Sequence, residues 1–315
     1  MQKRKLGNSG IEVAPLGFGG NVLGWTADEP TSFKLLDAFV SAGFNLVDTA
    51  DTYSGWVPGH QGGESETIIG KWLARTGNRK NVIIATKVGM KMPSGKEGLS
   101  KSHILASADE SLKRLQTDYI DLYQSHIDDQ KTPLDETLEA HAELIKSGKV
   151  RVIGASNYTA ERLTEALDVS KQRGLPPYKC LQPQYNLYTR ADFESKLQPL
   201  CVEQGIGVIP YFSLAAGFLT GKYRSEADLT KSGRGQGVKK YLNERGFRIL
   251  AALDQIAKET NSSPAKVALA WLMARPGITA PLASATSPEQ LNDLIGATEL
   301  HLDSAAIAVL DHASA

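Results

Sequence analysis

The sequence contains only two cysteines among its 315 residues and no long apolar run. Cys180 and Cys201 are not spaced like metal ligands, so we expect reduced thiols and no metal site. The first residues are basic but no apolar stretch follows them, and no later run is long enough to span a bilayer. The expectation is a soluble, cytoplasmic protein without a signal peptide or membrane segment.

The sequence also lacks an excess of charge of either sign, with 35 basic and 35 acidic side chains. A balanced chain gives no reason to expect nucleic acid or an anionic membrane as a partner. We therefore expect a small-molecule partner, and the composition leaves open whether the protein is a monomer or a homo-oligomer.

A third absence concerns the fold, because no G-x-G-x-x-G follows the first apolar run; GFGG at 17–20 is too short. Short apolar runs alternate along the chain with amphipathic segments that have apolar residues at i, i+3, i+4 and i+7. The apolar runs are 15–20, 44–49, 81–87, 119–126, 149–156, 180–186, 206–213 and 278–284. The clearest amphipathic segments are 31–43, 103–115, 134–148 and 191–205. Eight strand–helix units predict an α/β fold, a (β/α)8 TIM barrel forming a single domain over residues 1–315, with an open doubly wound sheet as the alternative.

Three further segments frame the predicted barrel. Turn residues between two short alternating pieces at 3–13 predict an N-terminal β-hairpin. A long polar loop, 221–246, follows the seventh strand, and its length favours a functional flap. Helices are expected at 248–259, at 263–275 with Ser263 as N-cap, and in the tail at 303–315.

Four polar side chains fall at or just after successive strand ends: Asp48, Tyr53, Lys87 and His126. The carboxyl ends of barrel strands share one rim, where barrel enzymes place their chemistry. An ammonium beside a phenol lowers the pKa of the phenol, and a carboxylate keeps a buried ammonium charged. The set therefore predicts that Asp48 holds Lys87, that Lys87 tunes Tyr53 as a general acid, and that His126 assists.

Each of these residues alone is also typical of a structural role. An aspartate at a strand end often caps a turn, a lysine there is usually solvated, and a tyrosine or histidine can be part of a pocket wall or core. Their placement at neighbouring strand ends favours the catalytic interpretation.

The chain resembles the aldo-keto reductase family over essentially its whole length, and it is similar to the bacterial and potassium-channel β-subunit-like branch. The motifs that carry the resemblance, in order, are DTADTY, GGESETIIGKWL, IATK, LYQSH, GASN, QPQYN and YFSLAAGFLTGKY. The resemblance assigns the family's catalytic tetrad to Asp48, Tyr53, Lys87 and His126. It implies a nicotinamide dinucleotide, usually NADP(H), bound in extended form across the barrel mouth.

The resemblance also implies which residues bind the cofactor. Ser156, Asn157 and Gln182 would bind the carboxamide, and Tyr211 would stack on the nicotinamide ring. The residues expected along the pyrophosphate are Ser213, Leu214, Gly217 and Lys222.

The segment 281–297 resembles the part of the family that binds the adenosine phosphate. The residues placed there are Ser284, Ala285, Thr286, Gln290 and Asp293. Gln290 and Leu294 stand where many NADPH-preferring members have a basic residue and an asparagine. A 2′-phosphate binds best to Arg or Lys, which Arg234 or Lys239 could supply. NADP(H) is favoured and NAD(H) stays open.

The function that these residues predict is reduction of an aldehyde or ketone to an alcohol by an NAD(P)H-dependent oxidoreductase, with Tyr53 as general acid. Trp25 and Trp56 are candidates for an apolar substrate wall, although core packing would equally explain them. Two alternatives remain: a Schiff-base aldolase that uses Lys87, and a cofactor-binding regulatory subunit with little turnover.

Overall fold

The computed structural model describes residues 1–233 and 235–315. Its central sheet has eight strands in the order β10-β3-β4-β5-β6-β7-β8-β9, and every neighbouring pair is parallel. The strands are β3 (Gly17–Gly19), β4 (Leu46–Asp48), β5 (Ile83–Val88), β6 (Ile120–Ser125), β7 (Val150–Ser156), β8 (Cys180–Gln182), β9 (Gly207–Val208) and β10 (Leu282–Ala283). Seven of these strands lie within the predicted apolar runs, and β5 extends one residue beyond its run, to Val88.

The two edges of this sheet meet, which closes it into a barrel. Val208 of β9 forms a parallel bridge with Ile278, and the amide of Leu282 donates to the carbonyl of Pro210 at 2.9 Å. On its other side, Leu282 pairs with Gly17 of β3. The (β/α)8 barrel prediction is therefore confirmed, and the open doubly wound alternative is wrong.

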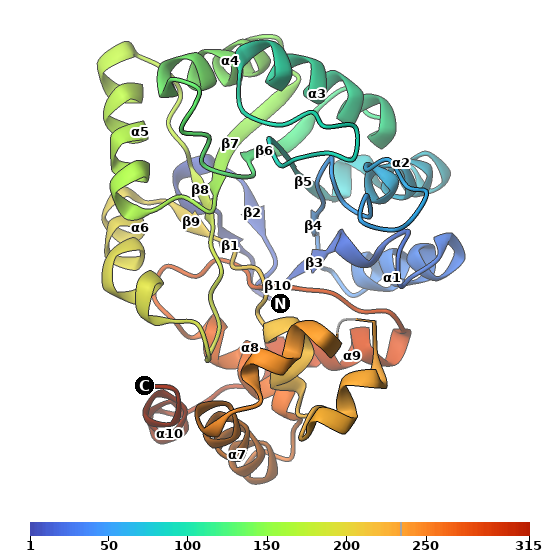
Figure 1. Ribbon diagram of the computed structural model, residues 1–315, viewed down its shortest axis with the longest axis vertical. Coiled ribbons are helices and arrows are strands. Elements are labelled where there is room, and N and C mark those ends of the chain that lie inside the picture. The colour runs from blue at the N-terminus through green and yellow to red at the C-terminus, as the bar shows by residue number, and fades with distance from the viewer. Residues whose placement is uncertain (234) are drawn as a thin grey trace.

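Helices surround the strands (Figure 1). They are α1 (Glu29–Ser41), α2 (Glu64–Thr76), α3 (Lys101–Leu115), α4 (Leu134–Lys146), α5 (Ala160–Arg173), α6 (Gln198–Gln204), α7 (Glu244–Glu259), α8 (Pro264–Met273), α9 (Pro288–Gly296) and α10 (Ser304–Ser314). As expected, Ser263 caps α8 by accepting from the amide of Lys266. The tail helix α10 packs beside α7, outside the ring of helices around the strands (Figure 1). Within the described residues, no helix combines the length and the apolar character needed to cross a bilayer.

The segment 191–205, expected as one helix, is helical from residue 191 to residue 204, with a π-helical turn at Phe193–Leu197 directly before α6. Pro199 has no N–H to donate to the carbonyl four residues earlier. The amide of Gln198 instead reaches back to Phe193, which widens the turn.

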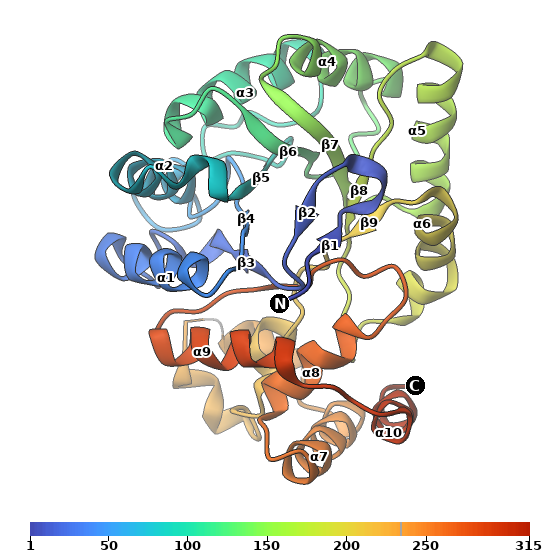
Figure 2. The same cartoon turned by 180° about the vertical axis from the view of Figure 1, so that it is seen from behind.

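The N-terminal hairpin is formed by β1 (Arg4–Lys5) and β2 (Glu12–Val13) and crosses one end of the barrel, as Figure 2 shows. Leu6, Ile11 and Val13 are buried there against the apolar layer inside the barrel. Six strands each contribute one residue to that layer: Leu46, Ala85, Leu122, Val152, Cys180 and Leu282. Ile209 and Ala280 also belong to it. The hairpin thus closes the end of the barrel where the strands begin.

The long segment after β9 is folded rather than extended. Its described part includes the 3-10 helices Glu226–Lys231 and Gly235–Tyr241, and Leu229, Val238 and Tyr241 are buried. The last residues of the predicted loop belong to α7, which Asn243 caps by accepting from the amide of Gly246.

Candidate active site

The structure brings Asp48, Tyr53, Lys87 and His126 together at the end of the barrel opposite the hairpin. Asp48 is the last residue of β4, Lys87 lies near the end of β5, and His126 directly follows β6. Tyr53 lies in the loop after β4, and its ring centre is 5.9 Å from that of His126. The predicted rim is therefore a physical cluster.

Lys87 is the centre of this cluster. Its side chain is fully buried, and its ammonium donates to Asp48 Oδ2 at 2.7 Å, to the Tyr53 hydroxyl at 2.8 Å and to the carbonyl of Thr49 at 2.6 Å. An ammonium has three hydrogens, so all of its donors are used. These three bonds orient the ammonium, with one N–H directed at the phenol oxygen.

The electrostatics of the cluster keep the proton on Tyr53. Burial raises the pKa of Tyr53 above its ordinary value, Lys87 opposes this rise and Asp48 adds to it. The ammonium does favour phenolate as expected, but burial outweighs it, so the expectation of a net lowered pKa is wrong for this structure. Burial would lower the pKa of Lys87, but Asp48 and Tyr53 reverse that effect and the pKa lies above 10.5. The resting site is an ammonium beside a protonated phenol.

His126 faces the phenol as a neutral ring. Burial, with a smaller contribution from the charge on Lys87, holds the pKa of His126 well below 6.5. Its Nδ1 is buried and has no hydrogen-bond partner within the described residues. A neutral imidazole can donate one hydrogen bond without adding charge.

The four residues that the resemblance assigns to the nicotinamide lie at or shortly after the ends of β7, β8 and β9. Ser156 and Gln182 are paired in register as the last residues of β7 and β8, and the Ser156 hydroxyl donates to the Gln182 carbonyl at 2.9 Å. Asn157, in the left-handed region with φ of 61°, accepts from the Tyr211 hydroxyl at 2.7 Å. The ring of Tyr211 is thereby held beside the barrel mouth.

The loop after Tyr211 has an unusual backbone. Phe212, Ala215 and Ala216 have positive φ angles although none is glycine, and Gly217 has φ of 96°. The Ser213 hydroxyl donates to the Pro210 carbonyl, and Lys222 lies close enough to Gly217 that an added Cβ there would be 3.4 Å from its Cε. The amides of Ser213 and Leu214 have no acceptor within the described part of the chain.

Most of the residues predicted to bind the adenosine phosphate are held by hydrogen bonds within the protein. Ser284 donates to Asn21 at 2.7 Å, and the Thr286 amide and hydroxyl both donate to Gln290 Oε1. Asp293 accepts from Ser263 and so braces α8.

Two basic residues, Lys239 and Arg234, were considered as partners of the 2′-phosphate. Lys239 is paired with Glu226 at 3.3 Å on the surface. Arg234 lies outside the described residues. Leu294, which the resemblance places where many members have an asparagine, is buried.

Trp25 and Trp56 meet edge to face with ring centres 5.5 Å apart, and Trp56 is 6.0 Å from the Tyr53 ring. Trp56 is 48% exposed, which excludes core packing as its role. The pair forms an aromatic wall beside the phenol.

Two groups of residues were missed from the sequence. Gln124, buried on β6, donates to Asp48 Oδ1 at 3.4 Å, and Gln182 donates to the same oxygen at 2.8 Å. Asp51 and Glu66 are buried nearby, and burial together with Glu66 raises the pKa of Asp51 to about 8. The available signal was a polar residue inside or beside an otherwise apolar run.

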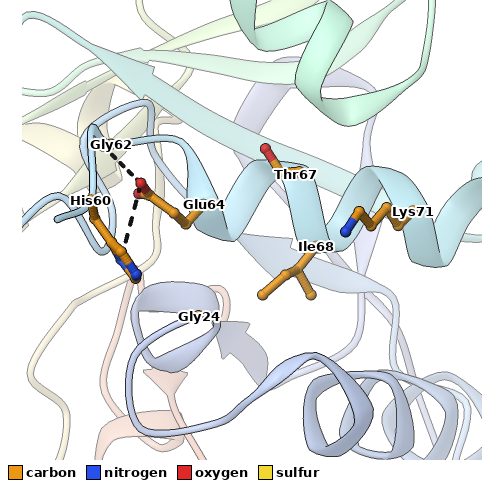
Figure 3. A pocket seen from close by; sticks show the side chains of 7 residues that line it. All are labelled: Gly24, His60, Gly62, Glu64, Thr67, Ile68 and Lys71. Carbon is orange, nitrogen blue, oxygen red and sulfur yellow. Dashed lines mark hydrogen bonds and ion pairs between the residues drawn. The ribbon is translucent and has the colours of Figure 1, made fainter. Parts of the chain in front are cut away.

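A cavity of about 300 Å³ lies beside the loop that follows Tyr53. In Figure 3, the side chains of His60 and Glu64 face each other, and Thr67, Ile68 and Lys71 line the cavity from α2. Glu64 accepts from the amides of Gln61 and Gly62. None of the four clustered side chains lines this cavity, so it is separate from the acid–base centre.

Comparison with known proteins agrees with this geometry. Residues 15–315 match the model of the aldo/keto reductase family. The chain is 36% identical to the Bacillus subtilis strain 168 protein named uncharacterized oxidoreductase YrpG, over 99% of this chain and 95% of that protein. It is 31% identical to norsolorinic acid reductase of Aspergillus flavus, over 97% of this chain and 79% of that protein. It is also 32% identical to a probable voltage-gated potassium channel subunit beta of Arabidopsis thaliana, over 95% and 92%. With a family match across nearly the whole chain and a barrel carrying this cluster at its open rim, the protein belongs to the aldo/keto reductase family.

Proposed function

We propose that this protein reduces aldehydes or ketones to alcohols, with a nicotinamide dinucleotide as hydride donor and Tyr53 as general acid. The observation that carries the proposal is the Lys87 ammonium, which contacts Asp48 at 2.7 Å and Tyr53 at 2.8 Å inside a buried site. We further propose that residues 1–315 act as one domain and that the protein works in the cytoplasm.

The proton path follows from the direction of these hydrogen bonds. Lys87 donates to the phenol oxygen, so the hydrogen of that hydroxyl is left for another acceptor, and none is found within the described residues. A carbonyl oxygen placed there would receive the proton as hydride arrives at its carbon. Once the proton has left, the ammonium stabilises the phenolate.

His126 fits a second contact to the same carbonyl oxygen. Its low pKa keeps it neutral near pH 7, so it can donate a hydrogen bond but does not compete with Tyr53 as the acid. Two donors converging on one oxygen would stabilise the charge that develops there.

The residues at the barrel mouth fit a nicotinamide dinucleotide. The bound dinucleotide would supply the hydride. Gln182 Oε1 has no hydrogen-bond partner in the described part of the chain and could accept from a carboxamide. Tyr211 offers a ring face, and the amides of Ser213 and Leu214, which have no acceptor among the described residues, suit a pyrophosphate. NADP(H) remains our first choice, with NAD(H) possible because Gln290 and Leu294 add no positive charge near the adenosine site.

The substrate wall supports a preference for aromatic or other apolar carbonyls. Trp56 is exposed beside Tyr53, and the ring of Trp25 packs edge to face against the ring of Trp56. Aromatic side chains bind flat apolar groups through their area and edge-to-face contacts.

The Schiff-base alternative is disfavoured because an aldolase lysine must reach its neutral amine form. Lys87 has three acceptors and a raised pKa, so it stays protonated. The regulatory alternative keeps some support from the relative named as a potassium channel subunit.

The test is an assay of NADPH, and separately NADH, oxidation with aromatic and aliphatic aldehydes, for the wild type and Tyr53→Phe. We expect carbonyl-dependent oxidation by the wild type and a loss of roughly 10²- to 10⁴-fold in the variant, the scale of general acid catalysis. Cofactor affinity should be retained in Tyr53→Phe. Cofactor binding without turnover in the wild type would support the regulatory role instead.

A further inference from the structure

One polar layer lies directly above the apolar layer inside the barrel. Side chains two residues apart on a strand point to the same face. Leu46, Ala85, Leu122 and Cys180 belong to the apolar layer. The residues two positions further along the same strands are Asp48, Lys87, Gln124 and Gln182, each at most 2% exposed. Four strands therefore send a polar side chain to the same level, next to the proposed proton donor.

The fifth strand of this layer, β7, contributes a glycine. Val152 of β7 belongs to the apolar layer, so the matching position is Gly154. A Cβ on Gly154 would lie 3.1 Å from Cγ of Gln124 and 3.0 Å from the carbonyl of Cys180. The missing side chain leaves the space through which Gln124, on β6, reaches across β7 to Gln182 on β8.

The amides meet on one oxygen of Asp48. Gln182 Nε2 donates to Asp48 Oδ1 at 2.8 Å and to Gln124 Oε1 at 3.2 Å, and Gln124 Nε2 donates to the same Oδ1 at 3.4 Å. Lys87 takes the other oxygen, Oδ2. Because a carboxylate only accepts hydrogen bonds, both amides must turn their nitrogens toward it, which fixes their orientation.

We propose that Gln124 is a positioning residue of the carbonyl reduction, which with Gln182 forms an amide bridge from the cofactor's carboxamide position to Asp48. This inference rests on the proposed function. Both hydrogens of Gln182 Nε2 are used by Asp48 and Gln124, so its Oε1 is held facing away from them as the acceptor for the carboxamide. Gln124 thus acts in two directions, on the cofactor through Gln182 and on Tyr53 through Asp48 and Lys87.

The amide bridge stabilises the Asp48 carboxylate because its ion pair with Lys87 is buried. A buried carboxylate that has lost its water needs further donors on the oxygen that its counter-ion does not use. The two amides supply these donors to Oδ1 and prevent the carboxylate from rotating. Oδ2 therefore stays on Lys87, and the ammonium stays on the phenol.

The test replaces Gln124 by a side chain of similar shape that forms no such bonds. For Gln124→Met we expect kcat to fall roughly tenfold to a hundredfold, the scale of a lost hydrogen bond to a charged group, with the aldehyde KM within about twofold of wild type. The Kd for NADPH, measured by titration without aldehyde, should weaken severalfold. Gln124→Asn, which keeps an amide but shortens its reach, should show the same split and serves if Gln124→Met does not fold.

Two further variants distinguish a positioning role of Gln124 from a general disturbance of the barrel. Tyr123→Phe removes a buried hydroxyl without a partner in the described residues, from the adjacent residue on the opposite face of β6, and should leave kcat and Kd unchanged. In a Gln182→Met background, Gln124→Met should weaken NADPH binding no further, because its effect passes through Gln182.

Wild-type kcat and Kd in Gln124→Met and Gln124→Asn, or an additive loss of affinity in the double variant, would overturn the amide bridge. Absence of turnover in the wild type would be a failure of the proposed function instead. In that case the NADPH affinities of the single and double variants still decide whether Gln124 acts through Gln182.

Discussion

Two buried aspartates, Asp48 and Asp121, sit at opposite ends of the strands of the same barrel, and each is 1% exposed. Asp121, near the start of β6, accepts from the amide of Ile84 and is paired with Arg79 at 2.8 Å and Arg151 at 2.6 Å. Asp48, at the end of β4, is paired with Lys87 at 2.7 Å. Both are fully supplied with donors, so pairing alone does not distinguish a structural aspartate from one in an active site.

The two aspartates differ in the other contacts that their paired cations make. Arg79 spends its remaining donors on Thr117 and on the carbonyls of Val82 and Tyr119, so that network ends in the framework. The cation beside Asp48 ends on Tyr53, whose proton has no acceptor within the described residues. An ion pair that leads to an unused proton at an open rim is equipped for chemistry, whereas one that ends in backbone carbonyls stabilises the fold.

Replacing Lys87 should have the largest effect on both activity and stability. Lys87→Met takes away the cation that stabilises phenolate and leaves Asp48 as an unpaired buried charge. We expect kcat to fall by roughly 10³-fold or more, and the free energy of unfolding to drop by about 3–5 kcal/mol. Steady-state kinetics and urea denaturation measure the two effects.

A second variant separates these effects. Adding Asp48→Asn to Lys87→Met removes the unpaired charge, so stability should recover while activity stays lost. Recovery of turnover in the double variant would show that the ion pair only maintains the fold.

The matching change at the other end of the barrel is Asp121→Asn. It should cost about 3 kcal/mol of stability, because two arginines and a backbone amide lose a charged acceptor. We expect a lower urea midpoint with an unchanged m-value, and kcat within about twofold of wild type. A large fall in kcat without loss of stability would contradict the structural role of Asp121.

Asp51 tests how burial and a neighbouring charge change the pKa of a carboxyl group next to the candidate active site. Its pKa is raised to about 8 by burial and by Glu66, whereas in the unfolded chain it is about 4. Between these values the folded state keeps a proton that the unfolded state has released, so stability falls as pH rises from about 4 to 8.

Asp51→Asn removes this titration, since an amide is neutral at every pH. The unfolding free energy of the variant relative to wild type should therefore rise with pH in that window, by up to about 1.4 kcal/mol per pH unit. Thermal unfolding of both proteins at pH 5 and pH 8 measures it. Parallel curves for the two proteins would show that Asp51 titrates normally.

The two aspartates also show how far the sequence alone reaches. Each lies in a short apolar run, and the runs themselves correctly predict the eight strands and the barrel, because burial on both faces makes parallel strands continuously apolar. Position within the run, at the end for Asp48 and near the start for Asp121, also separates the open rim from the closed end. The four clustered residues could therefore be identified from the strand ends and from the loop after β4.

What could not be predicted depends on contacts across strands that are not neighbours in the chain. Gln124 reaches Gln182 only because Gly154 leaves space between them, and no local pattern encodes that passage. The net pKa of Tyr53 was missed for a related reason: the sequence shows that a lysine is near but not how deeply both groups are buried. The π-helical turn before α6 was also not predicted, because the amphipathic pattern indicates a helix but not its local hydrogen-bond spacing.

Replacing Trp56 should have the smallest effect, a change in KM for the substrate at the open rim. Trp56→Ala should raise the KM for aromatic aldehydes by roughly two- to tenfold, the scale of one aromatic contact, and leave kcat and stability nearly unchanged. Aliphatic aldehydes should be affected less. Phe247→Ala is the matched control, because Phe247 is 42% exposed on α7 and contributes to none of the contacts of the cluster. If both variants raise KM alike, or if Trp56→Ala lowers stability, the aromatic wall is part of the packing and the selectivity of the rim must come from other residues.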